Sequence, residues 1–366
     1  MFIEELSLVN FKNFEQAEMK FSPDLNCFIG NNGAGKTNLM DAIYYLSFCK
    51  SFLNPVDLQN IRHRQDFFVI QGKYQRQGNE ENIYCGLKKG NKKHFKRNKK
   101  EYKKLSEHIG LLPLIVITPS DIDLIMGGSD ERRKFIDTVI SLYNHQYLDS
   151  LIRYNRALLQ RNNLLKQFAA TSRFQAESLE IWDDQLVHYA EIIHRERKLY
   201  IERFLPVFQN YYELISGGNE TIGLEHLSHL YNGDFATQLR EAGQRDRVLQ
   251  FTTVGIHKDD IEFKLGDFPI RKLGSQGQKK TFLVALKLAQ YNFVKEISGI
   301  TPILLLDDIF DKLDKHRVEQ IVKLVADDHF GQIFITDTNR EHLDRIVALV
   351  NAESRIFTIN NGSVGR

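Results

Sequence analysis

Short apolar runs separated by polar residues characterise the first 120 residues of the chain. Alternating apolar and polar positions predict a strand over 2–9, and further strands are predicted over 17–21, 25–29 and 114–117. A helix-like segment over 38–48 follows the third of these strands. Strands mixed with short helices are typical of an α/β arrangement.

The middle of the chain has a helical period instead. Apolar residues recur at helical spacing from about 131 to 168 and again from about 178 to 215. The small and polar residues 169–173 between them suit a turn, so we predict an antiparallel helical hairpin. We expect the aromatic side chains along both helices to form its core.

The α/β pattern resumes after about residue 251. Strands are predicted over 303–306 and 332–336, and a helix over 282–294. We therefore predict one α/β domain with a mixed sheet and helices, split in sequence by a helical arm. Its N-terminal part is 1–125, the arm is 126–250, and its C-terminal part is 251–366.

Composition narrows the class of protein. Of the 366 residues, 42% are hydrophobic and 26% charged, which fits a globular protein and excludes disordered and collagen-like chains. The longest apolar run is far short of the roughly 18 residues that a membrane span needs, and the N-terminus lacks a secretory pattern. We expect a cytoplasmic protein without a membrane partner. Cys27, Cys49 and Cys85 are too scattered for a disulfide framework or a cysteine-based zinc site.

A net charge of +2 conceals one strongly basic segment. Residues 88–104 hold ten Lys and Arg side chains against one acid, Glu101, with Phe95 and Tyr102 between them. With Asn98 suited to a turn, the segment predicts a basic β-hairpin that contacts DNA phosphates without reading bases. A solvated charged surface is the alternative interpretation. The proposed DNA contacts are Lys92, Lys93, Lys96, Arg97, Lys99 and Lys100.

The segment 28–37 fits the phosphate-binding pattern G-x-x-x-x-G-K-[ST] at every fixed position, between a predicted strand and a predicted helix. Its glycines let backbone N–H groups surround phosphates, Lys36 brings a positive charge, and Thr37 can bind Mg²⁺. A glycine-rich turn without a ligand is the alternative. The predicted nucleotide contacts here are Gly30, Asn31, Asn32, Gly33, Ala34, Gly35, Lys36, Thr37 and Asn38.

Two acids end the buried-strand pattern 303–306. A carboxylate at the carboxyl end of a strand beside a phosphate loop can hold Mg²⁺, so we assign Asp307 to the metal with Thr37. We assign Asp308 to orienting or deprotonating the attacking water, which makes it a catalytic residue together with Lys36. Acid pairs at strand ends also occur in loops and caps without any chemistry.

About 30 residues before these acids, Ser275, Gly277 and Gln278 lie in an S-x-G-Q segment that precedes a helix-like run. Ser275 is a candidate N-cap whose helix N-terminus could face a phosphate. The motif alone is weak. The order of phosphate loop, insertion, S-x-G-Q and strand with two acids carries the interpretation.

In that order, the chain resembles the ATP-binding-cassette ATPases of the chromosome-maintenance and repair type, and it is most similar to the RecF family. The resemblance covers nearly the whole chain. The segments that carry it are 8–14, 30–43, 119–121, 127, 132–137, 255–260, 275–280, 304–308 and 313–314. This sequence departs from the family's usual residues at several positions. Lys50 and Leu53 replace arginines, Ile256 and Lys258 replace Pro and Arg, and residues 311–312 replace Ser-Glu.

The resemblance implies an ATP-binding-cassette head whose two copies close around DNA when ATP is bound. Each ATP, with Mg²⁺, would lie between the phosphate loop of one copy and the Ser275 segment of the other. A weak ATPase stimulated by DNA would act as a timer. The implied partners are single-stranded and duplex DNA at gaps, and RecR and RecO, which help RecA replace single-strand-binding protein.

Other classes agree less well with the sequence. A transporter subunit lacks the helical insertion and the basic hairpin, a structural chromosome-organising ATPase needs far longer coiled coils, and a metabolite kinase lacks S-x-G-Q. A related overcoming-lysogenization-type nuclease would add a carboxylate metal domain, which we do not expect here. Another chromosome-maintenance-type ATPase that acts as a DNA clamp stays open. The chemistry of residues 257–260 does not indicate a role for this segment.

Overall fold

A computed structural model describes residues 1–171, 173–218, 220–309, 330–349 and 353–365. The chain forms two compact units: residues 1–121, 214–217 and 280–366 make the first, and residues 122–213 and 218–279 the second. By compactness, residues 251–279 group with the second unit, whereas the sequence-based division assigned them to the head. That division stays a prediction. Residues 311–314, which carry part of the resemblance, lie outside the described residues.

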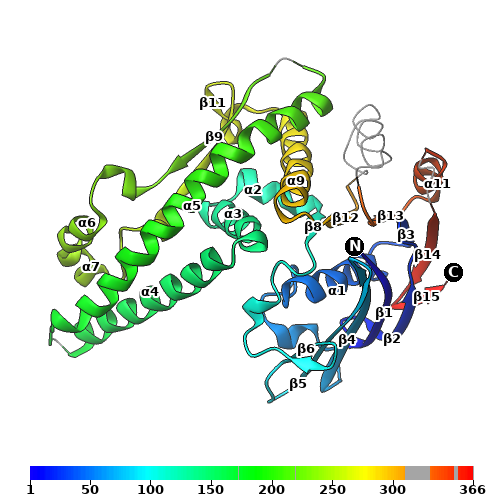
Figure 1. Ribbon diagram of the computed structural model, residues 1–366, viewed down its shortest axis with the longest axis horizontal. Helices are drawn as coiled ribbons and strands as arrows, with labels where there is room; N and C mark the ends of the chain where they lie inside the picture. The colour runs from blue at the N-terminus through cyan, green and yellow to red at the C-terminus, as the bar shows by residue number, and fades with distance from the viewer. Residues whose placement is uncertain (172, 219, 310–329, 350–352, 366) are drawn as a thin grey trace. The chain divides into compact units, whose positions relative to one another are not determined.

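A six-stranded sheet organises the first unit (Figure 1). Its order is β15-β14-β3-β13-β12-β8, and all neighbours pair in parallel except β14 with β15. The residues of β12 and β13 are buried throughout, which explains their continuous apolar sequences. The strands are β3 (Leu25–Ile29), β8 (Leu114–Ile117), β12 (Ile303–Asp307), β13 (Ile333–Asp337), β14 (Ser354–Asn360) and β15 (Ser363–Gly365).

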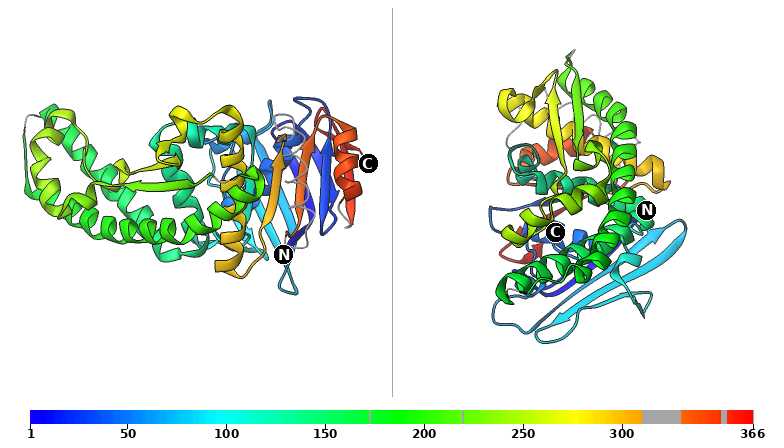
Figure 2. Two further views of the ribbon diagram at one scale, coloured as in Figure 1. Left: turned by 90° about the horizontal axis from the view of Figure 1, so that it is seen from above. Right: turned by 90° about the vertical axis from the view of Figure 1, so that its left-hand side faces the viewer.

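A second six-stranded sheet in this unit is antiparallel, with the order β2-β1-β4-β5-β6-β7. Its strands alternate buried and exposed residues, as expected for a sheet with one covered face. Figure 2 shows its long strands from two further directions. They are β1 (Phe2–Phe11), β2 (Phe14–Lys20), β4 (Phe67–Arg76), β5 (Asn79–Lys88), β6 (His94–Arg97) and β7 (Lys100–Glu101).

Aromatic side chains from several strands form much of the first unit's core. Phe21, Phe28, Phe334 and Phe357 form a cluster with ring centroids 4.9 to 6.1 Å apart. All three cysteines are free and buried, consistent with a role in packing. The helices α1 (Lys36–Phe48) and α11 (Arg340–Leu349) belong to this unit, as does most of α9 (Gln276–Ser298).

The second unit is dominated by helices, but the first predicted helix is two helices. The helix α3 (Ser129–Tyr143) ends just before Asn144, and α4 (His145–Thr171) begins just after it. The Asn144 side chain accepts a hydrogen bond of 2.9 Å from the Tyr147 backbone N–H, as an N-cap does. The continuous apolar spacing concealed this break, because a capped helix junction preserves the buried face.

The helix α4 and the long helix α5 (Glu177–Ser216) run antiparallel, as predicted (Figure 1). Residues progressively later in α4 meet residues progressively earlier in α5. The hydrogen-bonded pairs are Asn144 with Glu196, Arg153 with Tyr189, and Arg161 with Asp183.

The second unit also contains a three-stranded antiparallel sheet that the sequence analysis did not predict. Its order is β11-β10-β9, from β9 (Ile222–Leu227), β10 (Asp260–Leu265) and β11 (Phe268–Pro269). Short helices complete this unit: α2 (Asp123–Met126), α6 (Phe235–Glu241), α7 (Gly243–Leu249) and α8 (Ile270–Leu273). Within the described part of the chain, every helix is too short or too polar to span a bilayer.

Candidate nucleotide-binding site

The predicted phosphate loop joins β3 to α1 at the carboxyl edge of the parallel sheet. Gly33 has φ 78° and Gly35 has φ 119°, conformations that other residues adopt only with strain. A Cβ atom on Gly35 would lie 2.5 Å from Nδ2 of Asn13. The helix α1 begins at this loop without a side-chain cap, so its first N–H groups are available to an anion.

Lys36 turns back over the loop that precedes it. Its side chain is buried, and Nζ donates hydrogen bonds to the carbonyl oxygens of Gly30, at 2.6 Å, and Asn31, at 3.2 Å. The ammonium group is thus held beside the uncapped start of α1. A single positive charge and a ring of N–H groups are what polyphosphate binding requires.

Asn13 holds the loop from the antiparallel sheet. Its Nδ2 donates to the Ala34 carbonyl at 2.9 Å, and its Oδ1 accepts from Asn38 at 2.7 Å. The backbone N–H of Gly362, in the turn between β14 and β15, also donates to the Ala34 carbonyl at 3.0 Å. The loop is therefore fixed from both sheets before any ligand binds.

An open hollow of about 910 Å³ lies beside these contacts of Asn13. Lys12, Asn13 and Asn38 line it together with Asn54, Gln59 and residues 61–65, among them Arg62 and Arg64. Its volume is within the range of small-molecule sites. Asn13 and Asn38 line the hollow and also take part in the contacts that hold the phosphate loop, so the hollow adjoins the loop.

The predicted metal ligands meet directly. The Thr37 hydroxyl donates to Oδ1 of Asp307 at 3.1 Å, across 270 residues of sequence. Hydroxyl and carboxylate oxygens are ligands that Mg²⁺ prefers, and their position after the phosphate loop fits an ion that also contacts phosphates. The residues present therefore fit Mg²⁺ bound with a nucleotide.

Thr336, on the neighbouring strand β13, fixes both acids. Its hydroxyl donates to Oδ1 of Asp307 at 2.8 Å and accepts from the backbone N–H of Asp308 at 2.9 Å. Asp308 has φ 51°, a left-handed conformation that is uncommon for residues other than glycine. Thr336 thus supports a strained residue at the predicted catalytic position.

The charge on Asp307 is opposed by its surroundings. Burial raises the pKa of this carboxyl, and the neighbouring Asp308 adds to the rise, whereas the Thr336 and Thr37 hydroxyls and the Lys36 ammonium lower it. A divalent cation would favour the charged carboxylate and remove this conflict.

The S-x-G-Q segment belongs to the second unit and forms a capping box. The Ser275 hydroxyl accepts from the Gln278 backbone N–H at 3.2 Å, and the Gln278 side chain accepts from the Ser275 N–H at 2.8 Å. Ser275 is exposed and directly precedes the 23-residue helix α9, so it is the N-cap, as predicted. Gln278 also donates to Glu220 at 2.7 Å, which commits its side chain within the unit.

The basic segment forms the β5-β6-β7 edge of the antiparallel sheet, with the two-residue turn Asn98-Lys99 at its tip. Both turn residues have positive φ, 49° and 69°, as a type I′ hairpin requires. Phe95 is buried and packs on Tyr102 and His108, which anchors the hairpin.

The six candidate DNA contacts divide by environment. Lys93 is 13% exposed in its side chain and pairs with Asp57 at 2.7 Å, while Arg97 pairs with Glu81. These two charges are used within the protein. Lys92, Lys99 and Lys100 are exposed, and Lys96 lies half-buried with Nζ 5.6 Å from the Tyr84 ring centroid.

Sequence reasoning missed the residues that hold the site together. Asn13 was noted only as part of a resemblance, and Thr336 only as the end of a strand. Knowing that β13 lies beside β12 in the sheet would have indicated Thr336. The order of strands in a sheet cannot be read from one sequence.

Comparison with known proteins agrees with this geometry. The family model described as the RecF/RecN/SMC N-terminal domain matches residues 2–362. A "DNA replication and repair protein RecF" from Phocaeicola vulgatus is 55% identical over 366 residues, covering 100% of this chain and 98% of the relative. The protein of the same name from Bacteroides fragilis is 54% identical over 365 residues, with the same coverage.

Solved structures agree as well. The structure of the recombination mediator protein RecF-ATPrS in the RecFOR pathway matches with a TM-score of 0.89 and 29% identity, over 99% of this chain and 97% of that one. An Smc head domain derived from Pyrococcus furiosus matches with a TM-score of 0.58 at 18% identity over 99% of this chain and 95% of that one, which is a likeness of fold alone.

Proposed function

We propose that this chain, which belongs to the RecF proteins of the RecF/RecN/SMC N-terminal domain family, is an ATP-dependent DNA-binding protein of recombinational repair and replication. Relatives that match over their full length are named for DNA replication and repair, and a structural match is a recombination mediator. These names favour a mediator over a general DNA clamp. Work on the chromosome would locate the protein in the cytoplasm.

One observation carries the ATP part of the proposal. Thr37 and Asp307 meet at 3.1 Å beside the uncapped start of α1, where Lys36 is held over the loop. Mg²⁺ bound here would supply positive charge to the phosphate oxygens. Lys36 and the α1 N–H groups bind and orient the phosphates, and the polar hollow accommodates the rest of the nucleotide.

Hydrolysis is proposed to depend on Asp308. Its carboxylate would orient the attacking water or accept a proton from it. Thr336 keeps Asp308 in its left-handed conformation through the backbone N–H. We expect slow turnover stimulated by DNA, so that ATP acts as a switch.

The switch is proposed to control a homodimer. The exposed N-terminus of α9 at Ser275 would face the γ-phosphate bound by the partner copy, with its dipole favouring that negative charge. Loss of the phosphate removes this contact and opens the pair. Gly277 and Gln278 would support the same contact.

Single-stranded and duplex DNA at gaps is the proposed nucleic-acid partner, bound through Lys92, Lys96, Lys99 and Lys100. RecR and RecO are proposed as protein partners, consistent with the pathway named for the structural match, with RecA acting downstream.

The proposal is tested by sizing the full chain with Mg²⁺, with and without a non-hydrolysable ATP analogue and a gapped duplex, by analytical ultracentrifugation. We expect a monomer that becomes a dimer with the analogue. Lys36→Ala should remain monomeric, because the phosphates lose their cation, whereas the exposed Lys20→Ala in the same unit should dimerise normally. A wild-type chain that stays monomeric with saturating analogue and DNA would exclude the proposed switch.

A further inference from the structure

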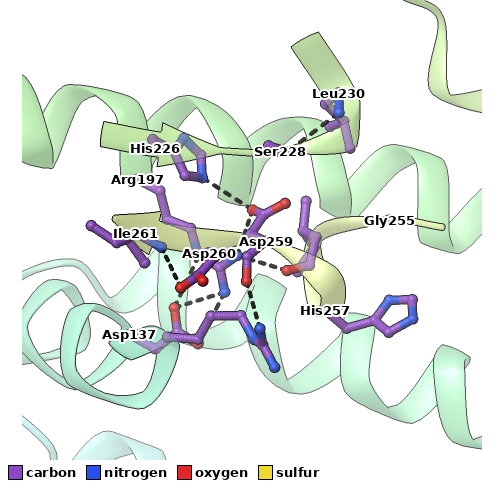
Figure 3. A network of polar contacts seen from close by, with 12 residues as sticks. Asp137, Arg197, His226, Ser228, Leu230, Gly255, His257, Asp259, Asp260 and Ile261 are labelled. Atoms are coloured by element: carbon purple, nitrogen blue, oxygen red, sulfur yellow. Dashed lines mark hydrogen bonds and ion pairs between the residues drawn. The ribbon is translucent and has the colours of Figure 1, made fainter. Parts of the chain in front are cut away.

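A buried charge network joins three elements of the second unit (Figure 3). Arg197, on α5, has a 2% exposed side chain and pairs with Asp137 at 2.9 Å and with Asp259 at 2.8 Å. Asp259 directly precedes β10 and belongs to the segment 257–260, for which the proposed function has no use. The network explains how the segment is fixed, but two buried polar atoms beside it have no hydrogen-bond partner among the described residues.

These atoms belong to residues that cluster. Nδ1 of His194 and Oδ1 of Asp259 are buried and have no hydrogen-bond partner among the described residues. His226, on β9, lies with its ring centroid 5.3 Å from that of His194, and its Nε2 is 3.1 Å from Oδ2 of Asp259. One donor atom from each of the three residues lies within 4.8 Å of the others.

We propose that His194, His226 and Asp259 form a binding site for a divalent transition-metal ion of the zinc type. Two imidazole nitrogens and one carboxylate oxygen suit zinc and cobalt, whereas magnesium and calcium prefer oxygen donors alone. Three protein ligands leave a further position for water. The ion would tie α5, β9 and the residue before β10 together.

The surroundings orient the ligands as the outer partners of a metal site do. Nδ1 of His226 lies 3.1 Å from the Tyr231 hydroxyl, so it can donate there when Nε2 exchanges its contact with Oδ2 of Asp259 for the ion. Arg197 holds Oδ2 of Asp259, which leaves Oδ1 for coordination.

Titration of the nucleotide-free full chain with Co²⁺, in excess Mg²⁺ to compete with Co²⁺ at Thr37 and Asp307, tests the proposal. We expect d–d absorption that saturates at one Co²⁺ per chain and is displaced by Zn²⁺. His194→Gln should weaken binding at least about 10-fold, because losing a ligand should matter no less than losing an outer partner. His188→Gln, an exposed site on the same helix, is the matched control and should bind normally.

A third variant separates ligation from folding. His194→Cys keeps a metal ligand and should add a sulfur-to-cobalt charge-transfer band, which a merely structural histidine would not yield. Circular dichroism confirms that each variant is folded, and His194 is a safe site because its Nδ1 makes no hydrogen bond among the described residues. Absent Co²⁺ absorption, or equal binding by His194→Gln and wild type, would overturn the proposal. Neither result bears on ATP-dependent dimerisation.

Discussion

A single threonine links the two acids of the candidate nucleotide site. Thr336 is fully buried, donates to Asp307 and accepts from the backbone of Asp308. It contacts neither phosphate nor water in the proposed reaction, so it is a positioning residue. Its strand lies between β3, which leads into the phosphate loop, and β12, which ends in the acids.

We predict that Thr336→Val lowers kcat for ATP about 10-fold or more while binding of the analogue changes little. Valine matches the shape of threonine but leaves the Asp308 N–H without its partner, which also costs about 1–3 kcal/mol of stability. Thr336→Ser keeps the hydroxyl and should recover most of kcat and its Mg²⁺ dependence. Steady-state ATPase assays over a range of Mg²⁺ concentrations measure this, and a serine variant as slow as the valine variant would contradict the role.

His108 makes stability depend on pH. Burial lowers its pKa to about 4, although a hydrogen bond of 2.7 Å to the Leu46 carbonyl opposes this. The unfolded histidine binds a proton below about pH 6.5 and the folded one only below about 4, so stability falls as pH drops through that window. At pH 5 the loss is about 2 kcal/mol.

We predict that the melting temperature falls from pH 7 to pH 5 and that His108→Gln reduces this slope. Glutamine retains hydrogen-bonding atoms for Leu46 and Tyr102 but cannot titrate. Its melting temperature at pH 7 will be lower because packing is lost, so the difference between the two pH values is the relevant measurement. His188→Gln, which changes an exposed histidine, is the control that should keep the wild-type slope.

At the scale of elements, the basic hairpin combines structure and charge. An unpaired strand edge is a hazard for aggregation, and exposed lysines on β7 and its turn would discourage pairing with another chain. That role needs only some of the charges. The concentration of positive charge on one edge also suits phosphate contacts, and the two roles are compatible.

Replacing Lys92, Lys96, Lys99 and Lys100 with glutamine should weaken DNA binding and flatten its salt dependence. Each phosphate contact removed should reduce the log–log slope by about 0.9 on duplex DNA. A control with four exposed cations outside the basic segment changed to glutamine should keep the slope: Lys20, Arg340, Arg345 and Arg355. Fluorescence anisotropy from low to high salt compares them, and equal slopes would place the DNA contact elsewhere.

The sequence predicted elements well where one local pattern decides them. The strands around the phosphate loop, the Asn98 turn and the Ser275 cap follow from short-range chemistry. The break at Asn144 was missed, because a capping asparagine inside a helical period changes no apolar position. The sheet of β9 and β10 was missed because it pairs residues far apart in sequence, such as Glu225 with Glu262.

At the scale of the whole molecule, the chemistry expected of the family is divided between the chain's two compact units. The phosphate loop, the predicted metal ligands and Asp308 belong to the first unit, whereas Ser275 belongs to the second. The sequence predicted these motifs but not the supporting contacts of Asn13 and Thr336, since those depend on sheet order. If ATP joins two copies, the phosphate loop and Ser275 need not meet within one chain.

The decisive prediction concerns that sharing and uses mixtures of inactive variants. Lys36→Ala damages the phosphate loop and Ser275→Arg blocks the surface offered to the partner copy, so each homodimer lacks both sites. In a mixed dimer, the loop of the Ser275→Arg copy meets the intact Ser275 of the other, which restores one site. Because only the mixed pair has a working site, and it has one of two, equal amounts should recover activity from near zero up to about half of wild-type ATPase.

The matched control is a mixture of Lys36→Ala with Asp308→Asn. Lys36 and Asp308 lie in the same unit of one chain, so every site in a mixed dimer is missing one of them and activity should stay low. ATPase assays with gapped DNA measure both mixtures, and sizing with the analogue confirms that mixed dimers form. If ATPase activity recovers in the mixture with Ser275→Arg but not in the control mixture, the site must be built from two copies. A site within a single chain would give the same result in both mixtures. Equal rates in both would mean that each chain hydrolyses ATP by itself.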